Sequence, residues 1–167
     1  MKISFLTIGG AALVFSLILG YLLVKLLTIT FRKKYHPDSP LNVAQGITLA
    51  GKISACMILI SGILTPIRDF LFISSSTHGV HSGAFWGFLA VCCCIVLITY
   101  VITSAFSTFL SKQVFKGKSL VVELQENNLA VGIINGVLIL MLALALLSIM
   151  GIFMQAFIPV PSIPTIG

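Results

Sequence analysis

Lys52 is the residue of this chain best placed to do chemistry, because it lies within an apolar run. A helix that begins near Asn42 carries Lys52 about 15 Å along its axis, close to the middle of a bilayer. Gln45 and Thr48 precede Lys52 by seven and four residues, so they share its helix face. An ionisable group at this depth costs at least about 2.5–3.5 kcal/mol and is by default a candidate functional residue. Gln45, Thr48, Lys52 and Asn135, the last in a later apolar run, form the candidate intramembrane polar site.

Two interpretations of this polar site are open. Lys52 and Asn135 can line a path for ions or small solutes, in which case the lysine favours anions over cations. Alternatively, the Lys52 side chain reaches back to the headgroups, and Asn135 links two helices by a hydrogen bond. A buried Lys52 needs a partner, and the sequence offers Asn135 or a backbone carbonyl near Gly51, because these apolar runs contain no carboxylate.

A six-residue motif is repeated at the start of two apolar runs. Asn-Val-Ala-Gln-Gly-Ile at residues 42–47 recurs as Asn-Leu-Ala-Val-Gly-Ile at residues 128–133. Asn42 and Asn128 are the expected polar caps of the two copies, at the level of the headgroups, and Ser39 with Pro40 is predicted to be an N-cap followed by a first-turn proline before the first copy. The chain is therefore expected to contain two copies of a helix pair.

Each copy also carries two small residues spaced four apart, Gly46 with Ala50 and Gly132 with Gly136. Small residues at this spacing let two membrane helices approach closely. We expect both motifs to form helix contacts, either with each other within one chain or across a symmetric oligomer. The sequence does not choose between these two arrangements.

The composition is that of an integral membrane protein. Charged residues make up 8% of the chain and hydrophobic residues 58%, with a mean hydropathy of +1.15, whereas soluble domains carry about 25% charged residues. Four apolar runs exceed the roughly 20 residues of a membrane-spanning helix, near residues 3–30, 43–64, 83–110 and 129–157. We predict an all-α fold with a single four-helix transmembrane domain over residues 1–167. Two parallel helix-pair repeats, at about 3–64 and 83–157, precede an outer tail at 158–167.

The basic residues predict the orientation of these helices. Most of them gather in the first and third connections: Arg32, Lys33, Lys34, Lys112, Lys116 and Lys118. The positive-inside rule places such connections in the cytoplasm, so both termini are expected outside (N-out, C-out). The two helix pairs then share one orientation. The formal net charge of +6 thus reflects membrane orientation, and no nucleic-acid partner is expected.

Two connections contain more than a turn requires. Residues 67–73 are apolar with one charge pair, and we expect a short interfacial helix there, after Thr65 and Pro66 end the second span. Residues 120–126 are amphipathic as either a helix or an extended segment. They place Glu123 and Glu126 just before the second repeated motif, where acidic groups favour a helix N-terminus.

The sequence contains none of the catalytic motifs that would indicate an enzyme. An HExxH pair, a phosphate loop and a nucleophile elbow are all missing. We therefore predict a protein that is not an enzyme and holds no metal and no cofactor. His78 and His81 lack further ligands near them in sequence, so a solvated loop is expected and their role stays open. Cys56 and the cysteines at 92–94 fall inside predicted spans and are expected to behave as small apolar residues.

The repeated motif, the four spans and the acidic patch together resemble the YjfL-like bacterial inner-membrane proteins, domain-of-unknown-function family 350. The matching residues, within about residues 10–150, are Asn42, Ala44, Gly46, Gly51, Glu123, Asn128, Ala130, Gly132 and Gly136. The chain departs from the pattern at Asn127, where a glycine is expected, in its longer outer loop and in its proline-rich tail. The resemblance implies four transmembrane helices in the bacterial inner (cytoplasmic) membrane and supplies no catalytic residues. Some relatives are encoded beside phage-shock-type membrane-remodelling proteins, which implies an envelope-stress or membrane-remodelling partner.

Two functional hypotheses follow. The first is a non-catalytic subunit that forms homo-oligomers in the lipid bilayer through its small-residue motifs and presents cytoplasmic loops to a partner. The alternative is an ion or small-solute channel or transporter with a polar path near Lys52.

Overall fold

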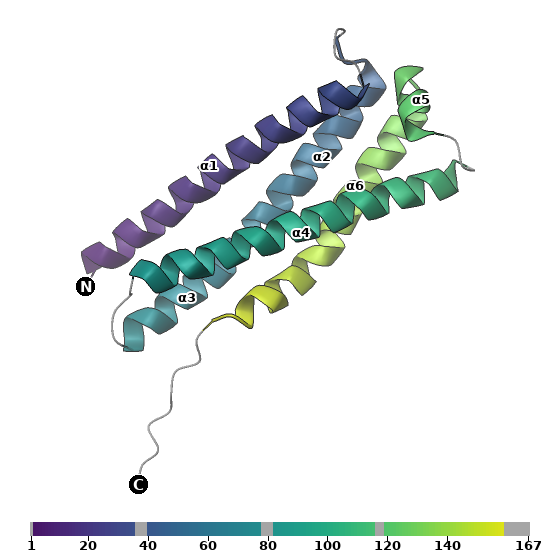
Figure 1. Ribbon diagram of the computed structural model, residues 1–167. Coiled ribbons are helices and arrows are strands. Elements are labelled where there is room, and N and C mark those ends of the chain that lie inside the picture. Colours follow the sequence, from purple (N-terminus) through teal and green to yellow (C-terminus); the bar gives the residue numbers. More distant parts are fainter. Residues whose placement is uncertain (1, 36–39, 78–81, 116–118, 159–167) are drawn as a thin grey trace.

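The described part of the chain is helical and contains four apolar stretches of membrane-spanning length. The computed structural model describes residues 2–35, 40–77, 82–115 and 119–158. Its helices are α1 (Lys2–Tyr35), α2 (Val43–Ser61), α3 (Leu64–Thr77), α4 (Ser82–Val114), α5 (Leu120–Gln125) and α6 (Leu129–Gln155) (Figure 1). The stretches long and apolar enough to cross a membrane are Leu13–Tyr35, Val43–Ile73, Gly83–Val114 and Leu129–Gln155. The prediction of an all-α membrane protein with four spans is confirmed.

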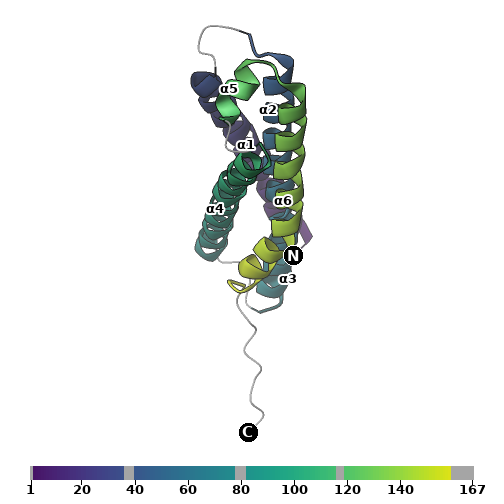
Figure 2. The ribbon, with the colours of Figure 1, turned by 90° about the vertical axis from the view of Figure 1, so that its right-hand side faces the viewer.

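The long helices run alternately up and down the bundle, so α2 and α6 point in the same direction (Figure 1). The end of α1, the start of α2, the end of α4 and α5 gather at one end of the bundle (Figure 1). We call this the basic end, because the last turns of α1 and α4 there carry Arg32, Lys33, Lys34 and Lys112. Figure 2 shows α2 and α6 side by side, with α4 crossing next to them.

The second apolar stretch contains two helices with a break between them. The break lies at Gly62 and Ile63, between the end of α2 and the start of α3. Pro66 does not end a helix, because it lies in the first turn of α3, where a missing N–H removes no intrahelical hydrogen bond. The prediction that Thr65 and Pro66 close the second span is therefore wrong, and the break comes earlier.

The main core lies where α3 packs against the first half of α4 and the later parts of α2 and α6. Ile67, Phe70 and Leu71 of α3 are buried in it. Phe70 stacks on Phe88 of α4, with 4.6 Å between the ring centroids, a geometry that adds to simple area burial. The segment expected to lie at the membrane surface thus contributes to the packed interior.

A second, smaller core closes the basic end. Phe31 and Tyr35 of α1 are buried there with Leu124 of α5 and Val131 of α6. These α1 rings reach the cluster because the helix continues to Tyr35, past its predicted end near residue 30. Residues 120–125, for which two conformations were open, form a helix.

The first long helix, α1, is peripheral. In an apolar 18-residue window of α1, 6% of the residues are buried, compared with 44% in the corresponding window of the stretch formed by α2 and α3. It packs mainly on α2 and makes few contacts with α4. Leu17 and Tyr21, which share one face of α1, are more than half exposed, so this face is available to lipid.

Candidate functional site

Two helices from the predicted repeats, α2 and α6, approach each other at backbone distance. A Cβ atom added to Gly51 would lie 2.7 Å from the Cα of Gly136, and one added to Gly132 would lie 2.7 Å from the carbonyl oxygen of Ala44. Backbone atoms cannot yield to such a clash, so these positions require glycine. Gly132 and Gly136 therefore form a helix contact within the chain.

The other small-residue motif, Gly46 with Ala50, lies outside this contact. A Cβ added to Gly46 would meet nothing within 4 Å, and Ala50 is exposed. α2 faces α6 with Ala44, Thr48 and Gly51 instead. Because two residues along a helix turn the side chain by about 200°, Gly46 cannot share the face of Ala44. Of the two arrangements that the sequence leaves open, contact between both motifs within one chain does not occur, because Gly46 and Ala50 lie off the contact between α2 and α6.

Asn42 and Asn128 are the N-cap residues of α2 and α6. The Asn42 side chain accepts the backbone N–H of Gln45 at 2.9 Å, and Gln45 Oε1 accepts the Asn42 N–H at 3.1 Å, which makes a capping box. Asn128 Oδ1 accepts the backbone N–H of Val131 at 3.4 Å, and its Nδ2 donates to Glu123 at 2.7 Å. The acidic residue before α6 therefore holds the cap itself.

Hydrogen bonds also tie the two helix starts to each other. Asn42 Nδ2 donates to the carbonyl oxygen of Leu124 at 2.7 Å, and the Ala44 backbone N–H donates to Asn127 Oδ1 at 3.0 Å. Asn127 has φ 57°, in the left-handed region where glycine is favoured and asparagine is tolerated. Asparagine therefore meets the conformational demand of the expected glycine and adds an acceptor that glycine lacks.

Three of the four polar candidates are completely buried between helices. Gln45 and Thr48 are 0% exposed and Asn135 is 1% exposed. Asn135 Oδ1 accepts hydrogen bonds from Ser107 at 3.2 Å and from Ser111 at 2.9 Å, which links α6 to α4. The Gln45 Nε2 and Asn135 Nδ2 atoms are buried with no hydrogen-bond partner among the described residues.

The two serines that bind Asn135 were not predicted from the sequence. With Thr103, also buried, Ser107 and Ser111 are spaced four residues apart along α4. A stripe of hydroxyl side chains at helical spacing within an apolar span was the signal that could have identified them.

Lys52 lies apart from the buried amides, on the side of α2 that faces α1. Its ammonium Nζ is 5.5 Å from the centroid of the Phe31 ring. It lines a cavity of about 490 Å³ between α1, α2 and α4, with Lys34 and Tyr100. Gln45, Thr48 and Asn135 are not among the residues that line this cavity, so the structure does not bring the four polar candidates together.

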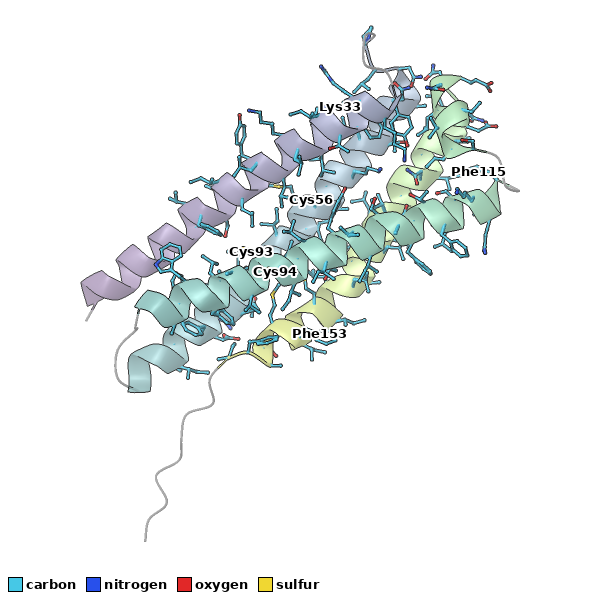
Figure 3. All side chains as sticks on the ribbon, in the orientation of Figure 1. Lys33, Cys56, Cys93, Cys94, Phe115 and Phe153 are labelled. Atoms are coloured by element: carbon cyan, nitrogen blue, oxygen red, sulfur yellow. The ribbon has the colours of Figure 1, made fainter. Side chains whose placement is uncertain are left out.

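The cysteine thiols in the described residues are free. Cys56 and Cys92 are buried, Cys93 is half-buried and Cys94 is exposed. Figure 3 places Cys56 on α2 between α1 and α4, and Cys93 and Cys94 on α4. The described residues contain no group of three or more histidine, cysteine or acidic side chains that could hold a metal ion. His78 and His81, whose role the sequence leaves open, lie outside the described residues.

Comparison with known proteins gives a family match over most of the chain. The family model described as Domain of Unknown Function (DUF350) matches residues 2–150. Comparisons with curated proteins and with solved structures give no match. The matched segment includes both copies of the repeated motif and nearly all of the four apolar stretches, and it confirms the resemblance inferred from those motifs. The chain belongs to the DUF350 family.

Proposed function

We propose that this protein is a non-catalytic subunit of the bacterial inner membrane that self-associates through the outer face of α2. The observation that carries the proposal is the outward position of Gly46 and Ala50. Gly132 and Gly136 lie in the contact between α6 and α2 within the chain. Gly46 and Ala50 lie on the surface of the bundle instead. A second copy can therefore approach α2 there as closely as α6 does on its inner side.

The chemistry of this face suits a helix contact. Gly46, Ala50 and Ser54 follow each other at four-residue intervals, and Ala50 and Ser54 are exposed. Membrane helices associate by close packing and hydrogen bonds, because lipid offers no hydrophobic driving force between them. A row of small side chains supports such packing, and the Ser54 hydroxyl adds an interhelical hydrogen-bond donor.

The basic end supports the second part of the proposal, a partner at the cytoplasmic surface. Arg32, Lys33 and Lys34 are exposed there at the end of α1. In α5, Val122 is 49% exposed while Leu120 and Leu124 are buried, so the helix is fixed to the bundle and offers one apolar side chain outward. By the positive-inside rule this end faces the cytoplasm, which gives the N-out, C-out orientation. A membrane-remodelling or envelope-stress protein is the proposed partner.

The molar mass of the purified protein in detergent, measured by light scattering, tests self-association. The parent is expected to exceed the mass of one chain, and the double variant Gly46→Leu with Ala50→Leu is expected to be monomeric, because leucine prevents close approach. Gly87→Leu is the matched control, since a Cβ added to Gly87 in α4 also meets nothing within 4 Å. A monomeric parent, or a double variant that keeps the parent mass, would contradict the proposal.

Gly132 and Gly136 are unsuitable for this test. Leucine at Gly132 would clash with the Ala44 backbone within the same chain, so a change in assembly could not be separated from a change in fold. The thermal midpoint of each variant provides the check, and Gly46→Leu with Ala50→Leu should leave it close to the parent value.

A conduit for ions or small solutes is the second candidate. It is favoured by the unpartnered Nε2 of Gln45 and Nδ2 of Asn135 in the interior, because buried polar groups without partners are costly unless water or a solute satisfies them. Chloride flux into liposomes separates the two functions when Asn135→Leu and Lys52→Leu are compared with the parent. Chloride flux in the parent that both substitutions abolish supports the conduit. If the parent shows no flux, or if neither substitution changes it, self-association is the supported function.

A further inference from the structure

A groove between α1 and α4 has a charged end and an apolar end. The cavity of about 490 Å³ at Lys52 and a second cavity of about 210 Å³ share the lining residues Leu27, Thr30, Tyr100 and Val101. The two cavities therefore lie against each other along the membrane-spanning part of α1 and α4. Their floor is α2, where Figure 3 shows Cys56 between the two helices.

At the charged end of the groove, two lysine ammonium groups lie over a pair of stacked aromatic rings. Phe31 and Tyr35 stack at 4.3 Å between centroids. Lys52 Nζ lies 5.5 Å from the Phe31 centroid, and Lys34 Nζ lies 5.8 Å from the Tyr35 centroid. The rings hold both ammonium groups at the mouth of the cavity, and no carboxylate is among the residues that line it. Two like charges at a membrane boundary favour an anion between them.

The inner end of the groove is apolar with one unused hydroxyl. Leu23, Leu26, Val96 and Leu97 line the smaller cavity. Tyr100 lines both cavities, and its hydroxyl is buried with no hydrogen-bond partner among the described residues. A ligand that fills this groove must therefore be apolar for most of its length and offer a polar atom near Tyr100.

We propose that the groove binds one anionic phospholipid, with its phosphate between Lys34 and Lys52 and one acyl chain between α1 and α4. The ester oxygens of the lipid, which follow the phosphate, are the natural acceptors for the Tyr100 hydroxyl. Charge complementarity selects this occupant, because basic pockets between membrane helices bind anionic lipid headgroups. The peripheral position of α1 allows the chain to enter sideways from the bilayer, without passage through water.

The headgroup arm of the test compares two lipids with identical acyl chains. Phosphatidylglycerol and phosphatidylcholine are added to the delipidated protein, and the thermal midpoint and the number of lipids retained in native mass spectrometry are recorded. The parent is expected to retain one phosphatidylglycerol and to prefer it over phosphatidylcholine. The double variant Lys34→Gln with Lys52→Gln should reduce that preference about tenfold or more. Each basic residue near the membrane surface contributes to the attraction of anionic lipids, and the variant removes two.

Matched controls separate the site from general charge. Lys33→Gln removes a neighbouring exposed cation that does not line the cavity, and it should keep the preference. Equal stabilisation by both lipids, equal loss in Lys33→Gln, or a shift reproduced by inorganic phosphate alone would overturn the proposal.

The acyl-chain arm leaves both lysines in place. Val101→Trp fills the groove at a residue that lines both cavities, whereas Ile102→Trp changes an exposed neighbour that lines neither. Loss of the retained lipid in Val101→Trp and its retention in Ile102→Trp is the expected result, even if the lysine variants fail to fold. Retention of lipid in both variants would overturn the proposal, as would a drop in oligomer mass in Val101→Trp, which would assign the groove to a second copy.

Discussion

The backbone N–H of Ala44, at the start of α2, donates a hydrogen bond of 3.0 Å to Oδ1 of Asn127, which precedes the cap of α6. In return, Asn42 Nδ2 donates to the Leu124 carbonyl oxygen at 2.7 Å. The starts of the two parallel helices are thus fixed to each other from both sides. Because the same helices meet at Gly51 and Gly136 further along, their relative position is defined at two separate points.

Substitutions of Asn127 separate its conformation from its hydrogen bond. Asn127→Gly keeps the left-handed conformation but leaves the buried Ala44 N–H without its acceptor, and is expected to lower the free energy of unfolding by about 1–3 kcal/mol. Asn127→Ala should cost about 1–2 kcal/mol more, because alanine is strained at φ 57°. Unfolding in sodium dodecyl sulfate, followed by circular dichroism, gives the order parent, glycine, alanine. Equal stability of the two variants would show that the backbone conformation is unimportant.

A single methyl group distinguishes the two faces of α2. Gly51→Ala places a Cβ 2.7 Å from the Cα of Gly136, and the helices must separate, at an expected cost of about 1–3 kcal/mol. Gly46→Ala introduces the same group into open space and should be neutral or stabilising by up to about 1 kcal/mol, because alanine is the better helix former. Thermal midpoints in detergent measure the difference. Similar midpoints for both variants would contradict the assignment of the contact face.

The link between α4 and α6 at Asn135 can be measured by a double-mutant cycle. Ser111→Ala removes the 2.9 Å hydrogen bond to Asn135 Oδ1, and Asn135→Leu removes both acceptor and unpartnered donor. The coupling energy is expected to be about 0.6–1.7 kcal/mol, as for hydrogen bonds between membrane helices generally. Additive effects of the two substitutions would mean that the bond contributes nothing to stability.

The number and approximate position of the spans could be predicted from the sequence, because lipid cannot solvate an exposed backbone and long apolar runs must be helical. The helix ends were less predictable. Pro66 was expected to end a span, but a proline in a first helical turn removes no hydrogen bond, and the chain instead breaks at Gly62 and Ile63. α1 passes its predicted end because Phe31 and Tyr35 are buried against α5 and α6.

The faces of the helices could not be read from spacing alone. Small residues of α2 occur on both sides, at Ala44 and Gly51 and at Gly46 and Ala50, and only the crossing with α6 decides between them. The same limit applies to Lys52, whose sequence neighbours suggested a common stripe with Gln45. Its actual environment includes Lys34 and Tyr100, which come from other helices and have no fixed sequence spacing from it.

Self-association through the outer face of α2 can be measured by disulfide crosslinking at Ala50. In a background with the four cysteines replaced by alanine, Ala50→Cys is oxidised in native membranes and compared with Ile98→Cys, an exposed position on α4. Self-association through this face predicts a dimer band for Ala50→Cys on a non-reducing gel and a monomer for Ile98→Cys. A monomer for Ala50→Cys, or equal dimer yields from both positions, would contradict it.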